Sequence, residues 1–274
     1  MSVTITAADI NKLRQTTGAG MLDCRKALTE SNGDFEAAID WLRKQGQKVA
    51  AKRSDREAKE GVVIAQTTAD HKSGIVLCVS AETDFVSRNP EFVAFVQTIA
   101  DAAIANNVQT AEELKGAKVG NETVADMIND KLASIGEKIE LTRFERVEAP
   151  YVASYIHGAN RMGVLVSMTK EAADAGKDVA MQIAAMNPLA VDETSISQET
   201  KDREKAIAIE MIKAEGKPAE MAEKIADGKM NKFFKDNTLM HQAFVKDNSK
   251  SVADYLKSVD ADLKVTDFKR VALG

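Results

Sequence analysis

The sequence has few of the residues from which disulfide-rich and metal-binding proteins are built. Only two of its 274 residues are cysteine, Cys24 and Cys78, and only three are histidine. The cysteines lie far apart among apolar neighbours, so we expect two reduced core residues rather than a disulfide or a nucleophile. The histidines lack metal-ligand spacing, which argues against a zinc site. We therefore expect no metal and no cofactor.

Long apolar runs and an excess of positive charge are also missing. No apolar stretch approaches the roughly 20 residues that span a bilayer, and the amino terminus lacks the pattern of a secretory signal. The formal net charge is −5. Because phosphate binding relies on clustered Lys and Arg, this charge favours a protein partner over nucleic acid or an anionic membrane. The expected location is the cytoplasm.

The chain is nevertheless rich enough in apolar residues to fold. Hydrophobic residues make up 44% of it and charged residues 29%, and its length suits two or three compact units. The first 46 residues predict three short helices. Thr6 and Asp9 resemble a capping box, Gly18 and Gly20 break the first helix, and Gly46 is expected to follow the third. So small a unit leaves an apolar patch for a partner.

The pattern changes from helical to strand-like after residue 61. β-Branched runs at 62–64 and 75–79 predict a hairpin, a helix is expected after Pro90, and a third strand is expected around Leu141 and Phe144. Residues 152–186 repeat the order of strand, turn, strand and helix. The repeat indicates a duplicated α+β core.

The next segment predicts a separate helical hairpin that turns at Gly216-Lys217-Pro218. The expected apolar stripes are Ile207, Met211 and Ala214 on one helix and Met221, Ile225 and Met230 on the other. Such a thin, charged arm is typical of elements that dock on a second chain or project as recognition elements. A helix around 252–259 and a strand within 263–273 are expected to complete the chain.

The residues leave two other functions open. Residues 44–59 are locally basic and could make the chain an RNA-binding adaptor, although they lack interleaved aromatic residues. An enzyme is the second alternative, but the residues present no catalytic constellation. The glycines at 18 and 20 follow a predicted helix, whereas a dinucleotide site requires a preceding strand.

Residues 82–86 (Glu-Thr-Asp-Phe-Val) form the most informative segment, because they follow a predicted buried strand. In one interpretation Phe85 folds back into the core and Asp84 caps a turn, and the residue types alone favour it. In the other, Phe85 is an exposed wedge and Asp84 a charged probe on a loop held by a rigid sheet. Residue types alone leave both interpretations open.

Three motifs resemble those of the bacterial elongation factor Ts family. Residues 16–28 (TTGAGMLDCRKAL) are similar to its amino-terminal signature, and residues 83–86 (TDFV) match its second signature. Residues 155–158 (YIHG) with 161–166 (RMGVLV) resemble a segment of its second subdomain. The similarity extends to Phe268 and covers nearly the whole chain.

The resemblance implies an α+β fold with four parts. These are a three-helix ubiquitin-associated-like domain (1–54), a core N-subdomain (55–148), a core C-subdomain (149–190 and 229–274) and an inserted helical hairpin that serves as a dimerisation arm (191–228). It also implies a non-enzymatic guanine nucleotide exchange factor for elongation factor Tu. A homodimer or a two-plus-two complex through residues 191–228 would follow.

The resemblance also implies which residues act. Thr83, Asp84, Phe85 and Val86 would disturb the Mg²⁺ and phosphate site of elongation factor Tu, promote GDP release and stabilise the nucleotide-free partner until GTP binds. The implied partner-binding residues are Arg14, Met21, Leu22 and His157. Two positions depart from the family pattern. Leu22 replaces a common methionine, and Glu82 stands where glutamine is common and adds charge beside Asp84.

Overall fold

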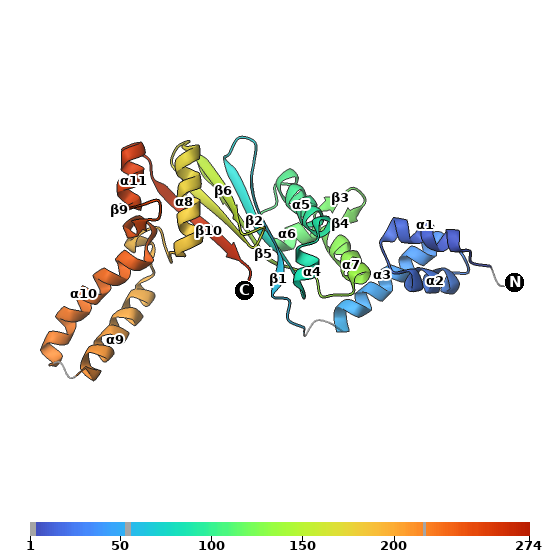
Figure 1. Ribbon diagram of the computed structural model, residues 1–274, viewed down its shortest axis with the longest axis horizontal. Coiled ribbons are helices and arrows are strands. Elements are labelled where there is room, and N and C mark those ends of the chain that lie inside the picture. Colours follow the sequence, from blue (N-terminus) through green and yellow to red (C-terminus); the bar gives the residue numbers. More distant parts are fainter. Residues whose placement is uncertain (1–3, 53–55, 216–217) are drawn as a thin grey trace. The chain divides into compact units, whose positions relative to one another are not determined.

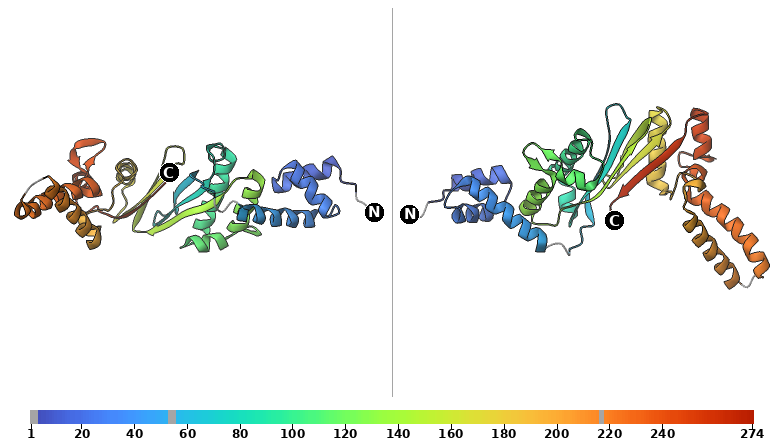
Figure 2. Two further views of the ribbon diagram at one scale, coloured as in Figure 1. Left: turned by 90° about the horizontal axis from the view of Figure 1, so that it is seen from below. Right: turned by 180° about the vertical axis from the view of Figure 1, so that it is seen from behind.

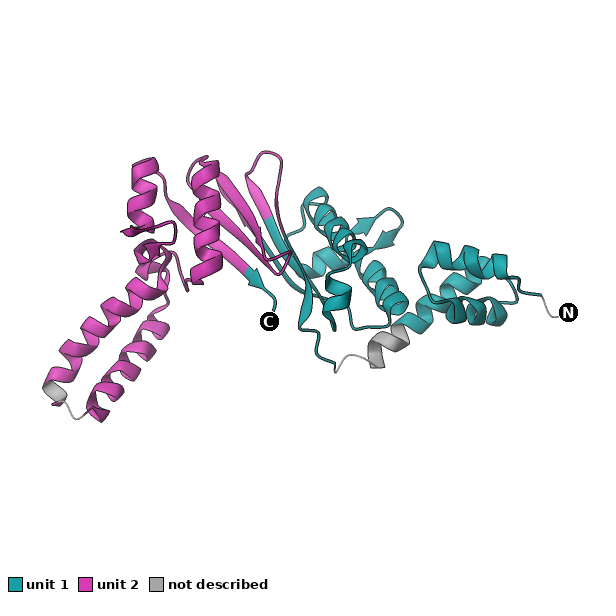
Figure 3. Cartoon of the chain, viewed as in Figure 1, with its two compact units in different colours: residues 1–64, 75–146, 271–274 teal, residues 65–74, 147–270 magenta. Residues whose placement is uncertain are grey.

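The computed structural model describes residues 4–52, 56–215 and 218–274 (Figure 1). Helices and strands are both well represented, which confirms the α+β class. Two compact units divide the chain (Figure 3). One contains Met1–Ile64, Ile75–Arg146 and Val271–Gly274, and the other contains Ala65–Gly74 and Val147–Arg270. The four-part domain division stays a prediction.

The first unit begins with three helices, α1 (Ala7–Thr17), α2 (Met21–Glu30) and α3 (Phe35–Lys52). The predicted capping box is confirmed, because the Asp9 amide donates to the Thr6 hydroxyl and the Thr6 amide donates to the Asp9 carboxylate. α1 ends at Gly18 in a left-handed conformation (φ 68°). The three helices share a small core of buried residues, which consists of Leu13, Ala19, Cys24, Ala27, Leu28, Ala38 and Leu42.

The expected end of the third helix at Gly46 is wrong. α3 continues past this residue, and Gly46 packs against α7 (Val124–Ile135). A Cβ atom at Gly46 would lie 2.9 Å from the Cβ of Ala133. The glycine therefore permits close helix packing instead of ending the helix.

Both cysteines are free and buried, as predicted. Burial raises the pKa of the Cys24 thiol above its ordinary value. Since the thiolate is the nucleophilic form, this shift disfavours nucleophilic chemistry at Cys24.

A three-stranded sheet in the order β1-β2-β5 follows the three helices. Its strands are β1 (Glu60–Thr67), β2 (Ser73–Ala81) and β5 (Glu140–Glu148), which confirms the predicted hairpin and third strand. α4 (Asp84–Ser87), α5 (Pro90–Ala105) and α6 (Ala111–Gly116) follow β2. Every residue of β2 is buried. The end of β2 is therefore a rigid base for the segment that follows it.

A short hairpin of β3 (Lys118–Val119) and β4 (Glu122–Thr123) precedes α7. The sequence pattern does not predict this hairpin, because two-residue strands carry no periodic signal.

The second unit contains a sheet in the order β10-β7-β6. β6 (Tyr151–His157) and β7 (Met162–Met168) pair antiparallel, and β10 is Val265–Ala272. α8 (Ala173–Met186) packs against β6 and β7. A Cβ atom at Gly176 would lie 2.6 Å from the Cβ of Ala153, so this close approach requires a glycine.

The remainder of the second unit contains short elements and the long hairpin. The short elements are the 3-10 helices η1 (Glu193–Ser195) and η2 (Leu239–His241), the strands β8 (Ala243–Phe244) and β9 (Asp247–Ser251), and the helix α11 (Val252–Val259). The helices of the hairpin, α9 (Gln198–Ala214) and α10 (Ala219–Asn237), lie side by side (Figures 1 and 2). Gly216 and Lys217 of the predicted turn lie outside the described residues.

The predicted apolar stripes of the hairpin are wrong in part. Ile207, Met211 and Met221 are 44%, 56% and 56% exposed, and Ala214 is exposed as well. The helices instead meet through Ala208, Ile212, Ala222 and Ala226, with Ile209 and Ile225 partly buried, while Met230 is buried as predicted. Small side chains at the contact let the two backbones approach, so the larger side chains face outward.

Candidate functional site

The 83–86 turn (Thr83, Asp84, Phe85 and Val86) follows the buried strand β2. It is not the open loop that the sequence predicted, because Asp84, Phe85 and Val86 lie within the one-turn helix α4 and Thr83 precedes it. The Arg88 amide donates to the Asp84 carbonyl at 3.0 Å and closes this turn. Four residues are too few to show helical periodicity, so the sequence pattern concealed α4.

Among the described residues, Phe85 has the most exposed large apolar side chain, at 86%. The interpretation in which it folds back into the core is therefore wrong. Val86, the next residue, is partly buried against the core of the first unit. The turn thus holds Val86 inside and presents the preceding residue, Phe85, to solvent.

A hollow of about 310 Å³ borders Phe85. It is lined by Gly18, Phe85, Val86, Asn89, Glu91, Phe92, Lys131, Ser134 and Ile135. Gly18 belongs to the connection between α1 and α2, and Phe92 belongs to α5. The hollow therefore brings the amino-terminal motif and the 83–86 turn to one place in the first unit.

Asp84 carries a partly exposed carboxylate. Its Oδ2 atom lies 3.2 Å from a guanidinium nitrogen of Arg88, one turn along the chain, and the Arg88 side chain is 77% exposed. A surface ion pair of this kind contributes about 0–1 kcal/mol. The carboxylate can exchange this partner for another at little cost.

The departure of Glu82 from the family pattern suggested an added negative charge beside Asp84. In the structure this charge has partners of its own. The Glu82 carboxylate is 16% exposed and lies 3.0 Å from a guanidinium nitrogen of Arg56. It also accepts a hydrogen bond from the Lys138 amide at 2.6 Å. The charge of Glu82 is compensated within the first unit.

The helices of the first unit expose the apolar surface that the sequence predicted. Met21 and Leu22 begin α2 and are 54% and 81% exposed, and Arg14 is exposed on α1. Met21 is therefore not a core residue. Exposed large apolar side chains of this kind are suited to binding a protein partner.

His157 ends β6 in the second unit and is exposed. Its Nδ1 atom lies 2.9 Å from the Tyr155 hydroxyl, and the two rings are 5.8 Å apart. The interaction with Tyr155 holds the imidazole at the surface. His157 belongs to the second unit, whereas the 83–86 turn belongs to the first.

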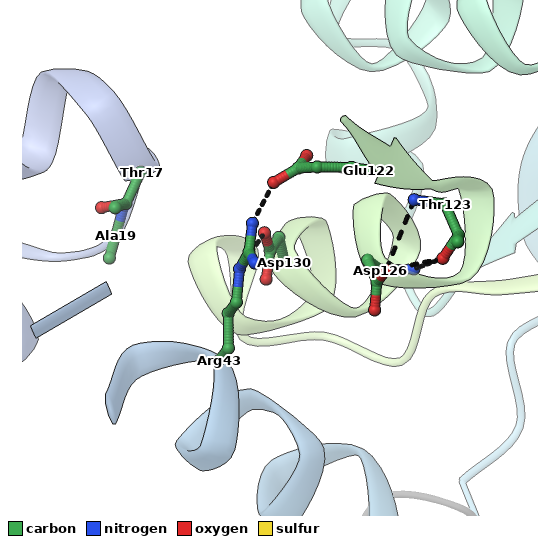
Figure 4. Close-up of polar contacts among 7 residues, drawn as sticks. All are labelled: Thr17, Ala19, Arg43, Glu122, Thr123, Asp126 and Asp130. Carbon is green, nitrogen blue, oxygen red and sulfur yellow. Dashed lines mark hydrogen bonds and ion pairs between the residues drawn. The ribbon is translucent and has the colours of Figure 1, made fainter. Parts of the chain in front are cut away.

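An ionic contact between α3 and the region of α7 was not predicted (Figure 4). The Arg43 guanidinium pairs with Glu122 on β4, and its Nε atom lies 3.7 Å from the Asp130 carboxylate on α7. Burial raises the pKa of Asp130, while Arg43 acts in the opposite direction. These residues lie about 80 positions apart in sequence, so no local pattern could reveal the contact.

Glu137 is a second residue that the sequence analysis missed. Its carboxylate accepts hydrogen bonds from both the amide and the hydroxyl of Thr83. The pairing is again distant in sequence, so a one-dimensional pattern carries no signal of it.

Metal clusters, membrane helices and the basic stretch can each be checked in the described part of the chain. Among residues 4–52, 56–215 and 218–274, no group of three or more His, Cys, Asp or Glu side chains could hold a metal ion. Within the same ranges, no helix is both long and apolar enough to cross a membrane. Much of the basic stretch lies outside the described side chains, which omit residues 47–55. Of its described cations, Arg56 pairs with Glu82 and Lys59 with Glu57.

Comparisons with known proteins point to one family. A family model described as elongation factor TS matches residues 82–274. The elongation factor Ts of Christiangramia forsetii is 50% identical over 273 residues, covering 98% of this chain and 99% of that protein. That of Flavobacterium psychrophilum is 50% identical over 274 residues, covering 99% of both chains. That of Xanthobacter autotrophicus is 48% identical over 288 residues, covering 98% of this chain and 92% of that protein.

Proposed function

Because the chain belongs to the elongation factor Ts family, we propose that it is a guanine nucleotide exchange factor for elongation factor Tu. Membership of this family connects the chain with the elongation step of protein biosynthesis. In the proposed role it catalyses no chemical reaction and acts in the cytoplasm. It binds the GDP form of its partner, promotes GDP release and stabilises the nucleotide-free form until GTP binds.

The observation that carries the proposal is the exposure of Phe85 on a turn that follows a fully buried strand. A rigid aromatic side chain presented to solvent is typical of residues that dominate a protein interface. In the proposed mechanism Phe85 enters elongation factor Tu as a wedge, and Asp84 brings a carboxylate close to its Mg²⁺ site. Thr83 and Val86 fix the backbone that carries both side chains.

The physical basis of the mechanism is the strict geometry of Mg²⁺. This ion requires nearly octahedral oxygen ligands at short distances, and it bridges the nucleotide phosphates to the protein. A wedge that displaces the protein ligands weakens nucleotide binding. By linkage, nucleotide binding weakens the binding of the factor by the same ratio, so the cycle is reversible and consumes nothing.

Other parts of the chain would supply binding energy without touching the Mg²⁺ site. We assign partner contacts to Arg14, Met21 and Leu22 in a ubiquitin-associated-like domain and to His157 in the core. The two sheet-containing parts would be related α+β subdomains. The exposure of the first three residues and the surface position of His157 support these assignments.

The hairpin is proposed as a dimerisation arm. Its outward side chains Ile207, Met211 and Met221 are about half exposed and supply an apolar surface. A homodimer, or a complex of two copies of each protein, would bury this surface.

The proposal is tested by the release of fluorescent GDP from purified elongation factor Tu. The intact chain should accelerate release in proportion to its concentration until the rate saturates. The double substitution Asp84→Ala with Phe85→Ala should preserve the fold and slow release strongly. Val259→Ala, which truncates another exposed apolar residue, is the matched control and should behave like the intact chain.

Either of two results would contradict the proposal. A folded intact chain that leaves GDP release unchanged would exclude the exchange function. A double variant with the full activity of the intact chain would exclude the wedge.

A further inference from the structure

The 83–86 turn has few contacts of its own that fix its conformation. α4 contains four residues, and forming a single helical turn is unfavourable without outside support. Phe85 is 86% exposed, so packing of its ring does little to fix the turn. Thr83 occupies the position before the helix, with extended backbone angles, but its hydroxyl donates to Glu137 instead of capping α4. Apart from the packing of Val86 against the core, the turn needs support from another part of the fold.

Glu137 supplies this support through both of its carboxylate oxygens. The Thr83 amide donates to Oε2 at 3.1 Å, and the Thr83 hydroxyl lies 2.9 Å from Oε1 and 3.1 Å from Oε2. Hydrogen bonds to an ionised carboxylate are shorter and stronger than those between neutral groups. Because one bond engages the backbone, Glu137 constrains the path of the chain as well as a side chain.

The neighbouring residues make the reciprocal contact. Glu82 accepts a hydrogen bond from the Lys138 amide. Residues 82–83 and residues 137–138 therefore each contribute one carboxylate and one backbone amide. Arg56 lies 3.0 Å from the second oxygen of Glu82 and compensates its charge. Residues 82–83 and 137–138 therefore form a clamp with bonds in both directions.

Both sides of this clamp are attached to rigid elements. Residues 82 and 83 directly follow β2, which is buried throughout. Glu137 follows Gly136, whose left-handed conformation (φ 79°) ends α7, and α7 is anchored by buried Val124 and Leu132. The clamp thus joins the end of a strand to the end of a helix, and the turn that carries Phe85 begins at this junction.

We propose that Glu137 is a positioning residue for nucleotide exchange, acting through Thr83 to preset the turn that carries Asp84 and Phe85. This inference rests on the proposed function. Glu137 contacts neither the nucleotide nor Mg²⁺. It raises the fraction of molecules in which Phe85 is ready to enter the partner, and the rate after docking falls in proportion when that fraction falls.

The first experiment uses the chain alone and does not depend on its partner. Amide hydrogen exchange is measured at Thr83 and along α5 in the intact chain, in Glu137→Ala and in Glu137→Gln. Glu137→Ala should accelerate exchange of the Thr83 amide about 10-fold and leave α5 unchanged. Glu137→Gln keeps an oxygen that accepts from this amide, so it should stay close to the intact chain. An unchanged Thr83 amide in Glu137→Ala would overturn the proposal.

The second experiment measures release of fluorescent GDP from elongation factor Tu at increasing concentrations of each variant. Glu137→Ala should lower the maximal rate about 10-fold, whereas the concentration giving half of that rate should change less than about two-fold, because the docking surfaces are intact. Glu137→Gln should restore most of the rate. Glu112→Ala removes an exposed carboxylate that pairs with Lys115 on α6, and it should match the intact chain.

The outcomes separate the inference from the function on which it rests. A faster Thr83 amide together with unchanged GDP release in Glu137→Ala would overturn the positioning role and leave the exchange function standing. An intact chain that fails to accelerate GDP release would overturn both, whatever the amide shows. If Glu137→Ala does not fold, the test uses Thr83→Val, which lacks the hydroxyl that donates to Glu137. Thr83→Ser keeps a hydroxyl and is compared with it. Equal maximal rates for those two variants would overturn the proposal.

Discussion

At the scale of single residues, the fold treats two phenylalanines of similar sequence surroundings in opposite ways. Phe85 is 86% exposed, whereas Phe92 at the start of α5 is 2% exposed. Full burial of such a side chain contributes about 1.5–3 kcal/mol relative to exposure. Phe85 therefore contributes little to the stability of the free chain and is available to a partner.

This difference gives a prediction about stability. Phe85→Ala should change the free energy of unfolding by about 0.5 kcal/mol or less, as for surface substitutions in general. Phe92→Ala should lower it by about 3–5 kcal/mol, because it leaves a cavity in the core. Urea denaturation followed by circular dichroism measures both values. A loss of about 2 kcal/mol or more in Phe85→Ala would mean that its ring is packed in solution.

Tyr255 gives a prediction about alkaline pH. Burial and the hydrogen bond that its hydroxyl donates to Asp178 raise its pKa from 10.0 to about 12. In the unfolded chain the phenol loses its proton near pH 10, whereas the folded chain keeps it to a higher pH. The stability that this group contributes is therefore complete below pH 10 and is lost as the pH rises from 10 to about 12.

Tyr255→Phe should remove this pH dependence. Between pH 10 and 12 the unfolding free energy of the intact chain should fall more steeply than that of the variant, as measured by urea denaturation at each pH. Equal slopes for Tyr255→Phe and the intact chain would show that Tyr255 is not buried as described.

At the scale of elements, the hairpin shows how a helix face is chosen. The sequence pattern favoured the large apolar residues, but α9 and α10 meet through alanines and Ile212. When large and small apolar residues lie on neighbouring faces of a helix, helical periodicity alone does not indicate which of the faces is buried. Only the distance between the two backbones decides which face is buried.

The buried alanines should not tolerate enlargement. Ala222 is 1% exposed, and Ala222→Leu should destabilise the hairpin by about 1–3 kcal/mol, because the added atoms force the helices apart. The adjacent Met221 is 56% exposed, so Met221→Ala should stay within about 0.5 kcal/mol of the intact chain. Amide hydrogen exchange along α9 and α10 measures the local effect. A larger destabilisation by Met221→Ala than by Ala222→Leu would support the buried stripe that the sequence predicted.

At the scale of the whole molecule, the proposed mechanism makes Mg²⁺ the target of the factor. Removing Mg²⁺ with a chelator should accelerate spontaneous GDP release from elongation factor Tu, because the phosphates lose their metal bridge. The chain should then add a smaller relative acceleration than it does with Mg²⁺ present. Release of fluorescent GDP with and without chelator measures this ratio. An acceleration that is independent of Mg²⁺ would leave the binding surfaces in place but remove the metal from the mechanism.

The sequence by itself determined the elements that carry strong local signals. The capping box at Thr6, the hairpin of β1 and β2 and the helix at 252–259 were all predicted, since caps and hydrophobic periodicity are written in neighbouring residues. The motifs at 16–28 and 83–86 likewise indicated the elongation factor Ts family, which the comparisons confirm.

Only the tertiary structure decided what depends on residues far apart in the chain. It placed Phe85 in solvent, put Gly46 inside a helix, turned the alanines of the hairpin inward and joined Thr83 to Glu137 across 54 positions. Each outcome depends on the shape and spacing of a second element, to which local sequence patterns do not refer. The sequence therefore specified the helices, the strands and the family, and packing between distant segments specified which side chains face solvent and how they are held.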